Sequence, residues 1–150
     1  MNDALMDIAS VEAKIASTIG DGGPFGAVII DENGSVISTG HNTVLKDHDP
    51  TSHAEINAIR EACKKKKTHN LNGCTIYSSC EPCPMCLSAI IWANIKNVYF
   101  ASTRKDAEKI GFRDNDIYEY LKGNKDILNI EKISNINCDK VINSYNKELY

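Results

Sequence analysis

The stretch CTIYSSCEPCPMCLSAIIWANIKNVYFAS, residues 74–102, decides the fold class. Its two ends, CTIYSS and NVYFAS, have the composition of short strands, and the residues from Pro84 onward have a helical pattern. A strand, a helix and a second strand in this order form a β–α–β unit, whose crossover makes the two strands parallel. The helix MCLSAIIWANI is apolar on nearly every side, so we expect it to be buried between the sheet and another layer.

Two further helices and a hairpin are predicted before this unit. Apolar residues recur at helical spacing until Gly20, at Leu5, Ile8, Val11, Ile15 and Ile19. FGAVIID and SVISTG are typical of strands joined by a turn at DENG, whereas HNTVLKDHDP is polar and irregular. A second amphipathic helix follows from TSHAE onward. The pattern predicts a layered α/β domain with a mixed sheet.

Composition favours a single cytoplasmic domain over residues 1–150. A chain of 150 residues can bury a substantial core but is short for two domains. Its formal net charge of −3 gives no general attraction to nucleic acid or to anionic membranes. MNDALMDIAS carries acidic residues and no apolar run, which predicts neither a signal peptide nor a membrane span. The 6 cysteines are therefore expected to stay reduced, because structural disulfides are rare in the cytoplasm.

Cys83 and Cys86 are candidate metal ligands at the start of a helix. Pro82 and Pro84 flank Cys83, and proline is favoured in the first turn of a helix. The free N–H groups and the dipole at this end of a helix favour thiolates, which bind zinc. Cys80 precedes the helix, and we expect it to belong to the core at the end of the strand.

A histidine is expected to complete the site, and His53 in TSHAE is the candidate because it falls in the first turn of the other predicted helix. His41 is a competitor, whereas His48 and His69 lie in polar loops and are expected to face solvent. Two helix N-termini would then meet at one metal ion.

Glu55 has two readings. Ser52 to Glu55 fits a capping box, in which the glutamate only satisfies a backbone N–H. Alternatively, a carboxylate two residues from a histidine ligand can accept and return a proton. Three protein ligands with one open position are typical of catalytic zinc. The combination of His-x-Glu and Pro-Cys-x-x-Cys is the signature of the zinc-dependent base deaminases. The signal is strong, because two separated motifs must agree in their order and in their chemistry.

The chain resembles the cytidine deaminase superfamily, and within it the bacterial guanine deaminases. The resemblance covers most of the chain, through GGPFGAVII, GHN, DPTSHAEINAIREAC, LNGCTIYSSCEPCPMCLSAIIWA, GFRDNDIY and the terminal NKELY. It implies a three-layer α/β/α sandwich around a mixed five-stranded sheet. It also implies a homodimer in which a C-terminal segment, residues 122–150, covers the active site, in some members from the neighbouring subunit.

The resemblance further implies that guanine and water are converted into xanthine and ammonia. One zinc ion per chain would be held by His53, Cys83 and Cys86, with Glu55 as the proton shuttle. The implied contacts with the purine come from Asn42, Asp114, Tyr150, Phe25, Trp92 and Ala54. Of these, Asn42 would hydrogen-bond the base, Asp114 would accept from its N–H groups and Tyr150 would close over it.

Two other functions remain open. A tRNA adenosine deaminase shares the zinc motifs but needs a surface for RNA, and Lys64 to Lys67 form the main basic run of this acidic chain. A structural zinc module would need a fourth ligand, such as Cys80, and would leave Glu55 as a helix cap. Neither a nucleic acid nor a membrane is the expected partner.

Overall fold

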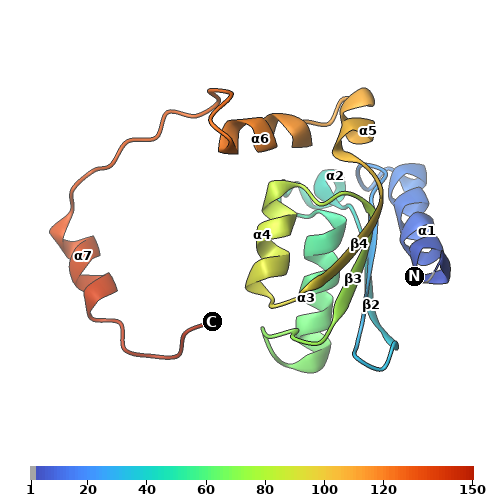
Figure 1. Cartoon of the computed structure of the whole chain (residues 1–150), viewed down its shortest axis with the longest axis horizontal. Helices are drawn as coiled ribbons and strands as arrows, with labels where there is room; N and C mark the ends of the chain where they lie inside the picture. The colour runs from blue at the N-terminus through green and yellow to red at the C-terminus, as the bar shows by residue number, and fades with distance from the viewer. Residues whose placement is uncertain (1–2) are drawn as a thin grey trace.

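The computed structural model describes residues 3–150 and contains a mixed sheet in the order β2-β1-β3-β4 (Figure 1). The strands are β1 (Gly26–Ile30), β2 (Val36–His41), β3 (Thr75–Cys80) and β4 (Asn97–Ser102). β1 pairs antiparallel with β2 and β3, whereas β3 and β4 are parallel, as the β–α–β pattern predicts. The expected fifth strand is not present among residues 3–150. The chain enters a helix directly after β4, so β4 remains an edge strand.

Helices cover both faces of the sheet, which confirms the three-layer architecture (Figure 1). α1 (Asp3–Ile19) lies on one face, and α3 (Ala54–Lys66) and α4 (Pro84–Trp92) lie on the other. Alternate residues of β1 serve the two layers, because successive side chains of a strand point to opposite faces. Val28 packs with Leu5 of α1, whereas Ala27 and Ile29 belong to the larger core beneath α3 and α4.

The buried face of α1 differs from the expected one. Val11, Ile15 and Ile19 are exposed, and the helix instead buries a stripe of small residues, Ala9, Ala13 and Ala16. Gly26 explains this preference, since a Cβ atom there would come within 2.1 Å of the carbonyl oxygen of Ala9. The alanines thus let the helix backbone approach β1 closely. Spacing in the sequence cannot distinguish such a contact from one made by larger side chains.

The connection between β2 and α3 holds a short helix that was expected to be irregular. α2 spans Val44–Asp47 and ends at His48, whose φ of 51° is left-handed. The amide groups of Leu45 and Lys46 both donate to the carbonyl oxygen of Asp21, 3.0 Å away. This loop is thereby attached to the turn that follows α1.

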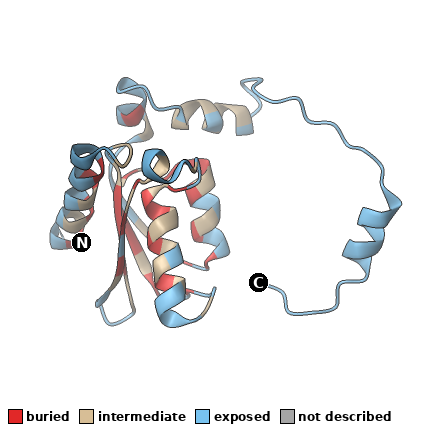
Figure 2. Ribbon diagram, turned by 180° about the vertical axis from the view of Figure 1, so that it is seen from behind, coloured by how far each residue is buried: buried red, intermediate tan, exposed pale blue. Residues whose placement is uncertain are grey.

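The chain after β4 contains α5 (Arg104–Lys109), α6 (Asp114–Leu121) and α7 (Ile136–Asn143), and it leaves the body of the molecule after α6. α5 is fixed by a capping box between Thr103 and Asp106. Every residue from 121 to 150 is exposed, and the segment with α7 loops away from the sheet and its helices (Figures 1 and 2).

α4 is less buried than its apolar sequence predicts. Leu87, Ile91 and Trp92 are exposed, because no helix or strand within residues 3–150 covers the outer face of α4. None of the helices within residues 3–150 is long and apolar enough to cross a membrane.

Candidate metal and active site

His53, Cys83 and Cys86 come together at one point although 30 residues of sequence separate the histidine from the first cysteine. The Nδ1 atom of His53 lies 3.5 Å from the sulfur of Cys83 and 3.5 Å from that of Cys86. All three ligand atoms lie within 4.8 Å of one another. Both thiols are buried, and the imidazole is partly exposed.

Two neighbouring helix N-termini position these groups. His53 is the N-cap residue of α3 and Cys83 is the N-cap residue of α4, which begins at Pro84 as predicted. α3 and α4 lie side by side on the same face of the sheet (Figure 1). Their free N–H groups and the positive ends of their dipoles favour negative charge on the sulfurs. The fold thus concentrates two thiol groups where thiolates are stabilised.

The donor set fits zinc in type and in spacing. Tetrahedral zinc with bonds of ~2.3 Å to sulfur and ~2.0–2.1 Å to nitrogen holds S and N roughly 3.5 Å apart. The two S–N distances in the structure are both 3.5 Å. No fourth cysteine or histidine belongs to the group among residues 3–150. Cys80 is buried at the end of β3, and its sulfur donates to the carbonyl oxygen of Thr103.

The protonation of the two thiols is strongly coupled. Hydrogen bonds with Cys86 and then with His53 lower the pKa of Cys83 to about 4, against the opposing effect of burial. The pKa of Cys86 is raised by its hydrogen bond with Cys83 and by burial, since a second thiolate would lie beside the first. The hydrogen bond with Cys83 also raises the pKa of His53. A divalent cation between the three groups would stabilise both thiolates and replace the shared protons.

Glu55 is not a helix cap. α3 begins at Ala54, its N-cap is His53 and no side chain completes a capping box there. The Glu55 carboxylate is 6% exposed and accepts a hydrogen bond of 3.0 Å from the hydroxyl of Ser78 on β3. Burial, followed by the charge of Cys83, raises the pKa of Glu55. A buried carboxyl group with a raised pKa, beside the ligand group, is suited to accept and return protons.

A cavity of about 430 Å³ opens over these residues. His53, Glu55 and Cys83 line it from the starts of α3 and α4. The turn after α1, the loop with α2, residues 112–114 and the end of β3 with Cys80 and Glu81 form the remaining walls. The cavity therefore joins the ligand group, the buried carboxyl group and three connections that are distant in the sequence.

Asn42 lines the cavity with only 4% of its surface exposed. Its Oδ1 atom accepts a hydrogen bond from the backbone N–H of Val44, 3.1 Å away. None of the hydrogen bonds found among residues 3–150 uses its Nδ2 atom. Because no buried side-chain nitrogen or oxygen of these residues lacks a partner, the Nδ2 atom must be accessible from the cavity. The amide N–H groups are thus left for a ligand in the cavity.

Asp114 and Phe25 also line the cavity, as the resemblance implies. Burial, followed by the charge of Cys83, raises the pKa of Asp114. The ring of Phe25 packs edge-on against Phe112 with centroids 4.8 Å apart. The hydroxyl of Tyr118 donates to the carbonyl oxygen of Pro82 at 2.6 Å, which attaches α6, and with it Asp114, to the loop before Cys83.

The remaining expected residues lie elsewhere in the chain. Trp92 is exposed at the far end of α4, so it does not form a wall of this cavity. Tyr150 contacts Trp92 there, with ring centroids 5.7 Å apart. Ala54 is fully buried in the core and is not among the lining residues. His48 and His69 are exposed, as predicted.

Several lining residues were not expected from the sequence. Gly22 and Gly23 allow close packing, since a Cβ atom at Gly22 would come within 2.0 Å of the Asn42 side chain. Glu81 and Arg113 add opposite charges to the rim. Glu81 directly follows Cys80, and Arg113 directly follows Phe112 in GFRDNDIY. Neither residue has a spacing that indicates a contact with a ligand.

The sequence matches known deaminases over its first two thirds. Residues 1–102 match the model of the cytidine and deoxycytidylate deaminase zinc-binding region. The guanine deaminase of Bacillus subtilis is 52% identical over 102 residues, which cover 68% of this chain and 65% of that protein. A tRNA-specific adenosine deaminase of Aquifex aeolicus is 43% identical over 100 residues, covering 67% of this chain and 65% of that protein. The chain thus spans 65% of the length of these two curated relatives.

The similarity of the folds extends further along the chain. The crystal structure of the guanine deaminase of Bacillus subtilis superposes with a TM-score of 0.88 at 38% identity. The superposition covers 100% of this chain and 99% of the other.

Proposed function

Because this chain belongs to the cytidine and deoxycytidylate deaminase family, we propose that it is a zinc-dependent hydrolase that converts guanine and water into xanthine and ammonia. The observation that carries the proposal is the cavity in which Asn42 and Asp114 accompany the His53 group and Glu55. The resemblance to a guanine deaminase over both sequence and fold supports the same substrate.

Asn42 and Asp114 would select guanine by their opposite hydrogen-bonding roles. The free amide N–H groups of Asn42 can donate to an acceptor of the purine, and the Asp114 carboxylate can accept from its N–H groups. Guanine presents ring and amino N–H donors together, whereas adenine lacks a ring N–H on its pyrimidine ring. A base that leaves a buried carboxylate unpaired is disfavoured by about 1–3 kcal/mol or more.

His53, Cys83 and Cys86 would hold the zinc ion, which supplies Lewis acidity and an activated water when bound. Glu55 would take a proton from the attacking water and deliver it first to a ring nitrogen and later to the departing amine. The hydroxyl of Ser78 keeps the Glu55 carboxylate in place beside the ligand group. The thiols must be reduced for this role, so the protein is proposed to act in the cytoplasm, where thiols are kept reduced.

A tRNA adenosine deaminase is the second candidate, because such enzymes match a similar or larger share of the chain, at lower identity than the guanine deaminase. The basic run at Lys64–Lys67 argues against it. This run lies at the C-terminal end of α3, a helix of 13 residues, and the ligand group lies at the other end. At 1.5 Å per residue the two are roughly 20 Å apart, so the basic run does not border the cavity. A structural zinc module is disfavoured by the buried Glu55 and by the separate position of Cys80.

The chain is proposed to be a single domain that acts as a homodimer, with residues 122–150 of one subunit covering the cavity of the other. Within one chain the segment is fully exposed, including apolar side chains such as Ile133, Val141 and Leu149. Its last residue, Tyr150, lies near Trp92 rather than near its own cavity. An apolar segment that remains uncovered in one chain favours contact with a second.

The proposed reaction is tested with the zinc-loaded protein and a panel of guanine, adenine, cytosine and tRNA. Ammonia release is measured together with chromatography of the base product. We expect equal amounts of xanthine and ammonia from guanine and no inosine in the tRNA. Inosine in the tRNA without xanthine would favour the second candidate. A zinc-loaded protein that releases no ammonia from any of the four would contradict the proposal and favour a structural role of the metal.

A further inference from the structure

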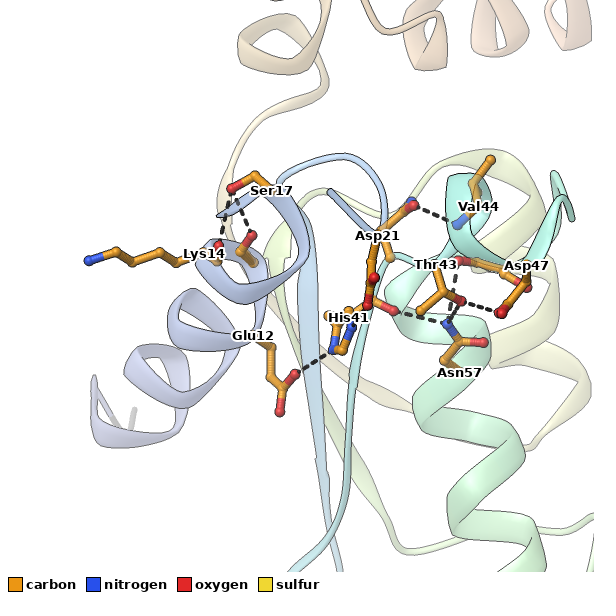
Figure 3. A network of polar contacts seen from close by, with 12 residues as sticks. Glu12, Lys14, Ser17, Asp21, His41, Thr43, Val44, Asp47 and Asn57 are labelled. Carbon is orange, nitrogen blue, oxygen red and sulfur yellow. Dashed lines mark hydrogen bonds and ion pairs between the residues drawn. The ribbon is translucent and has the colours of Figure 1, made fainter. Parts of the chain in front are cut away.

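His41 is the last residue of β2 and bridges two carboxylates (Figure 3). Its Nδ1 atom lies 3.0 Å from Oε2 of Glu12 in α1, and its Nε2 atom lies 2.9 Å from Oδ2 of Asp21 in the turn after α1. The side chains are partly buried, with exposed fractions of 24% for His41, 18% for Glu12 and 14% for Asp21. The histidine was considered above only as a competing metal ligand, and it has no place in the ligand group.

The geometry requires a charged imidazole ring. A carboxylate accepts hydrogen bonds, and both ring nitrogens can donate only when the ring is doubly protonated. The charged groups that face the ring are both acids, Glu12 from α1 and Asp21 from the following turn. Burial by itself lowers the pKa of His41, but the hydrogen bonds with Asp21 and Glu12 outweigh it and raise the pKa overall.

This bridge is connected to the cavity by two routes. Along the chain, Asn42 follows His41 directly, and Nδ2 of Asn57 holds the backbone oxygen of His41 at 2.9 Å. Through space, the backbone oxygen of Asp21 receives the amide groups of residues 45 and 46 at the start of α2. Gly22, next to Asp21, packs directly against the side chain of Asn42.

The wall of the cavity around Asn42 is therefore held in part by this bridge. It consists of Gly22 and Gly23 from one connection and of Asn42, Val44 and Leu45 from another. His41 directly precedes Asn42 in the second connection. Its ring contacts Asp21, which directly precedes Gly22 in the first connection, and Glu12 in α1. Moving Asp21 would shift both Gly22 and the carbonyl oxygen on which α2 begins.

We propose that the doubly protonated His41 is a positioning residue that holds the Asn42 wall of the cavity in its base-binding conformation. The inference rests on the proposed function in one respect, namely that Asn42 binds the purine. His41 does not touch the substrate. Its loss of a proton breaks one of the two contacts, because a lone pair then faces a carboxylate. The wall loosens, and the affinity for guanine falls while the proton transfers by Glu55 are unaffected.

The test compares the pH dependence of KM and kcat for guanine in the zinc-loaded wild type and in Glu12→Gln, from about pH 6 to about pH 9. Removing one carboxylate lowers the pKa of His41. We therefore expect KM to begin its rise at a lower pH in Glu12→Gln than in the wild type. Between the pH at which KM rises in the variant and the pH at which it rises in the wild type, KM of the variant should be about tenfold higher. The kcat values should be nearly unchanged. Glu61→Gln is the matched control, since Glu61 lies on the outer side of α3 and forms an ion pair with Lys65 of the same helix.

A second variant and a direct measurement complete the test. His41→Arg keeps a permanent charge and two-sided donation, so its KM should lack the rise at high pH. NMR titration of the His41 ring reports its charge even if an arginine does not fit and even if guanine is not the substrate. A neutral His41 ring at pH 7 by this titration, or a wild-type pH profile of KM in Glu12→Gln, would overturn the inference. A wild type that does not deaminate guanine, with His41 charged, would instead contradict the proposed function alone.

Discussion

The hydroxyl of Ser78 on β3 lies 3.0 Å from Oε1 of Glu55 on α3 and 2.7 Å from the backbone oxygen of Cys80, so these two acceptors share its single proton. The contact joins the central sheet to the buried carboxyl group of the site. It fixes the direction of that carboxyl group, since both residues are almost fully buried. Ser78 thereby supports the proposed proton shuttle without lining the cavity.

Ser78→Ala should reduce the turnover of guanine by about tenfold, because a hydrogen bond to a charged group contributes about 1.5–3 kcal/mol. Zinc content should remain unchanged. The measurement is kcat of the zinc-loaded variant. Ser88→Ala, which removes a hydroxyl bonded to the Pro84 carbonyl oxygen within α4, serves as the control. A wild-type kcat in Ser78→Ala would show that Glu55 needs no such support.

Glu55→Gln should lower kcat by at least about 10²-fold, the usual scale for the loss of general acid–base catalysis. The amide keeps the size of the side chain and its bond with Ser78, so zinc content should be retained. Steady-state rates and metal analysis on the same sample check both expectations. A nearly normal rate would assign the proton transfers to another group.

Metal content distinguishes the proposed ligand Cys83, the N-cap residue of α4, from Cys80, the last residue of β3. Cys83→Ala should lose the zinc ion and the activity, because two ligands are too few for a tight site. Cys80→Ser should keep the metal, since the Cys80 sulfur bonds the backbone of Thr103 and burial raises the pKa of Cys80 to about 12. Elemental analysis of the purified variants provides the measurement. Stoichiometric zinc in Cys83→Ala would contradict the ligand assignment.

The bridge made by His41 should stabilise the fold in a pH-dependent manner. The pKa of His41 in the folded protein is raised above its usual value of 6.5. Its contribution is therefore fully present below pH ~6.5 and is lost as the pH rises through the folded pKa. Denaturant unfolding should show the largest difference between wild type and Glu12→Gln at the acidic end of this range. A difference that does not shrink toward alkaline pH would contradict the charged bridge.

Deleting residues 146–150 should leave zinc content and melting temperature intact, because these residues are exposed. If Tyr150 closes over the purine in a neighbouring subunit, kcat/KM for guanine should fall by about tenfold or more. Mixing this truncated protein with a Glu55→Gln protein tests the exchange, since mixed dimers would pair an intact tail with an intact Glu55. No recovery of activity after mixing would argue that each tail serves its own subunit.

The ligand group and the β–α–β unit could be predicted from the sequence because their signals are local. Pro84 marks the start of α4, and the spacing of Cys83 and Cys86 follows from one turn of helix. His53 and Glu55 likewise lie at the start of a helix, α3, two residues apart. The capping box remained open as an interpretation of Glu55, and the structure excludes it because the N-cap of α3 is His53 and the Glu55 carboxylate faces Ser78 on β3.

Distant packing determined the remaining features. Four strands form instead of five, the alanines of α1 rather than its larger side chains meet Gly26, and Trp92 lies far from the cavity. Asn42 and Asp114 line the same cavity because the chain leaves β2 and β4, on opposite edges of the sheet, at the same end of the strands. The bridge from His41 to Glu12 and Asp21 joins residues 29 and 20 positions apart. Hydrophobic spacing specifies which face of an element is apolar, but it contains no information on which distant polar groups that element brings together.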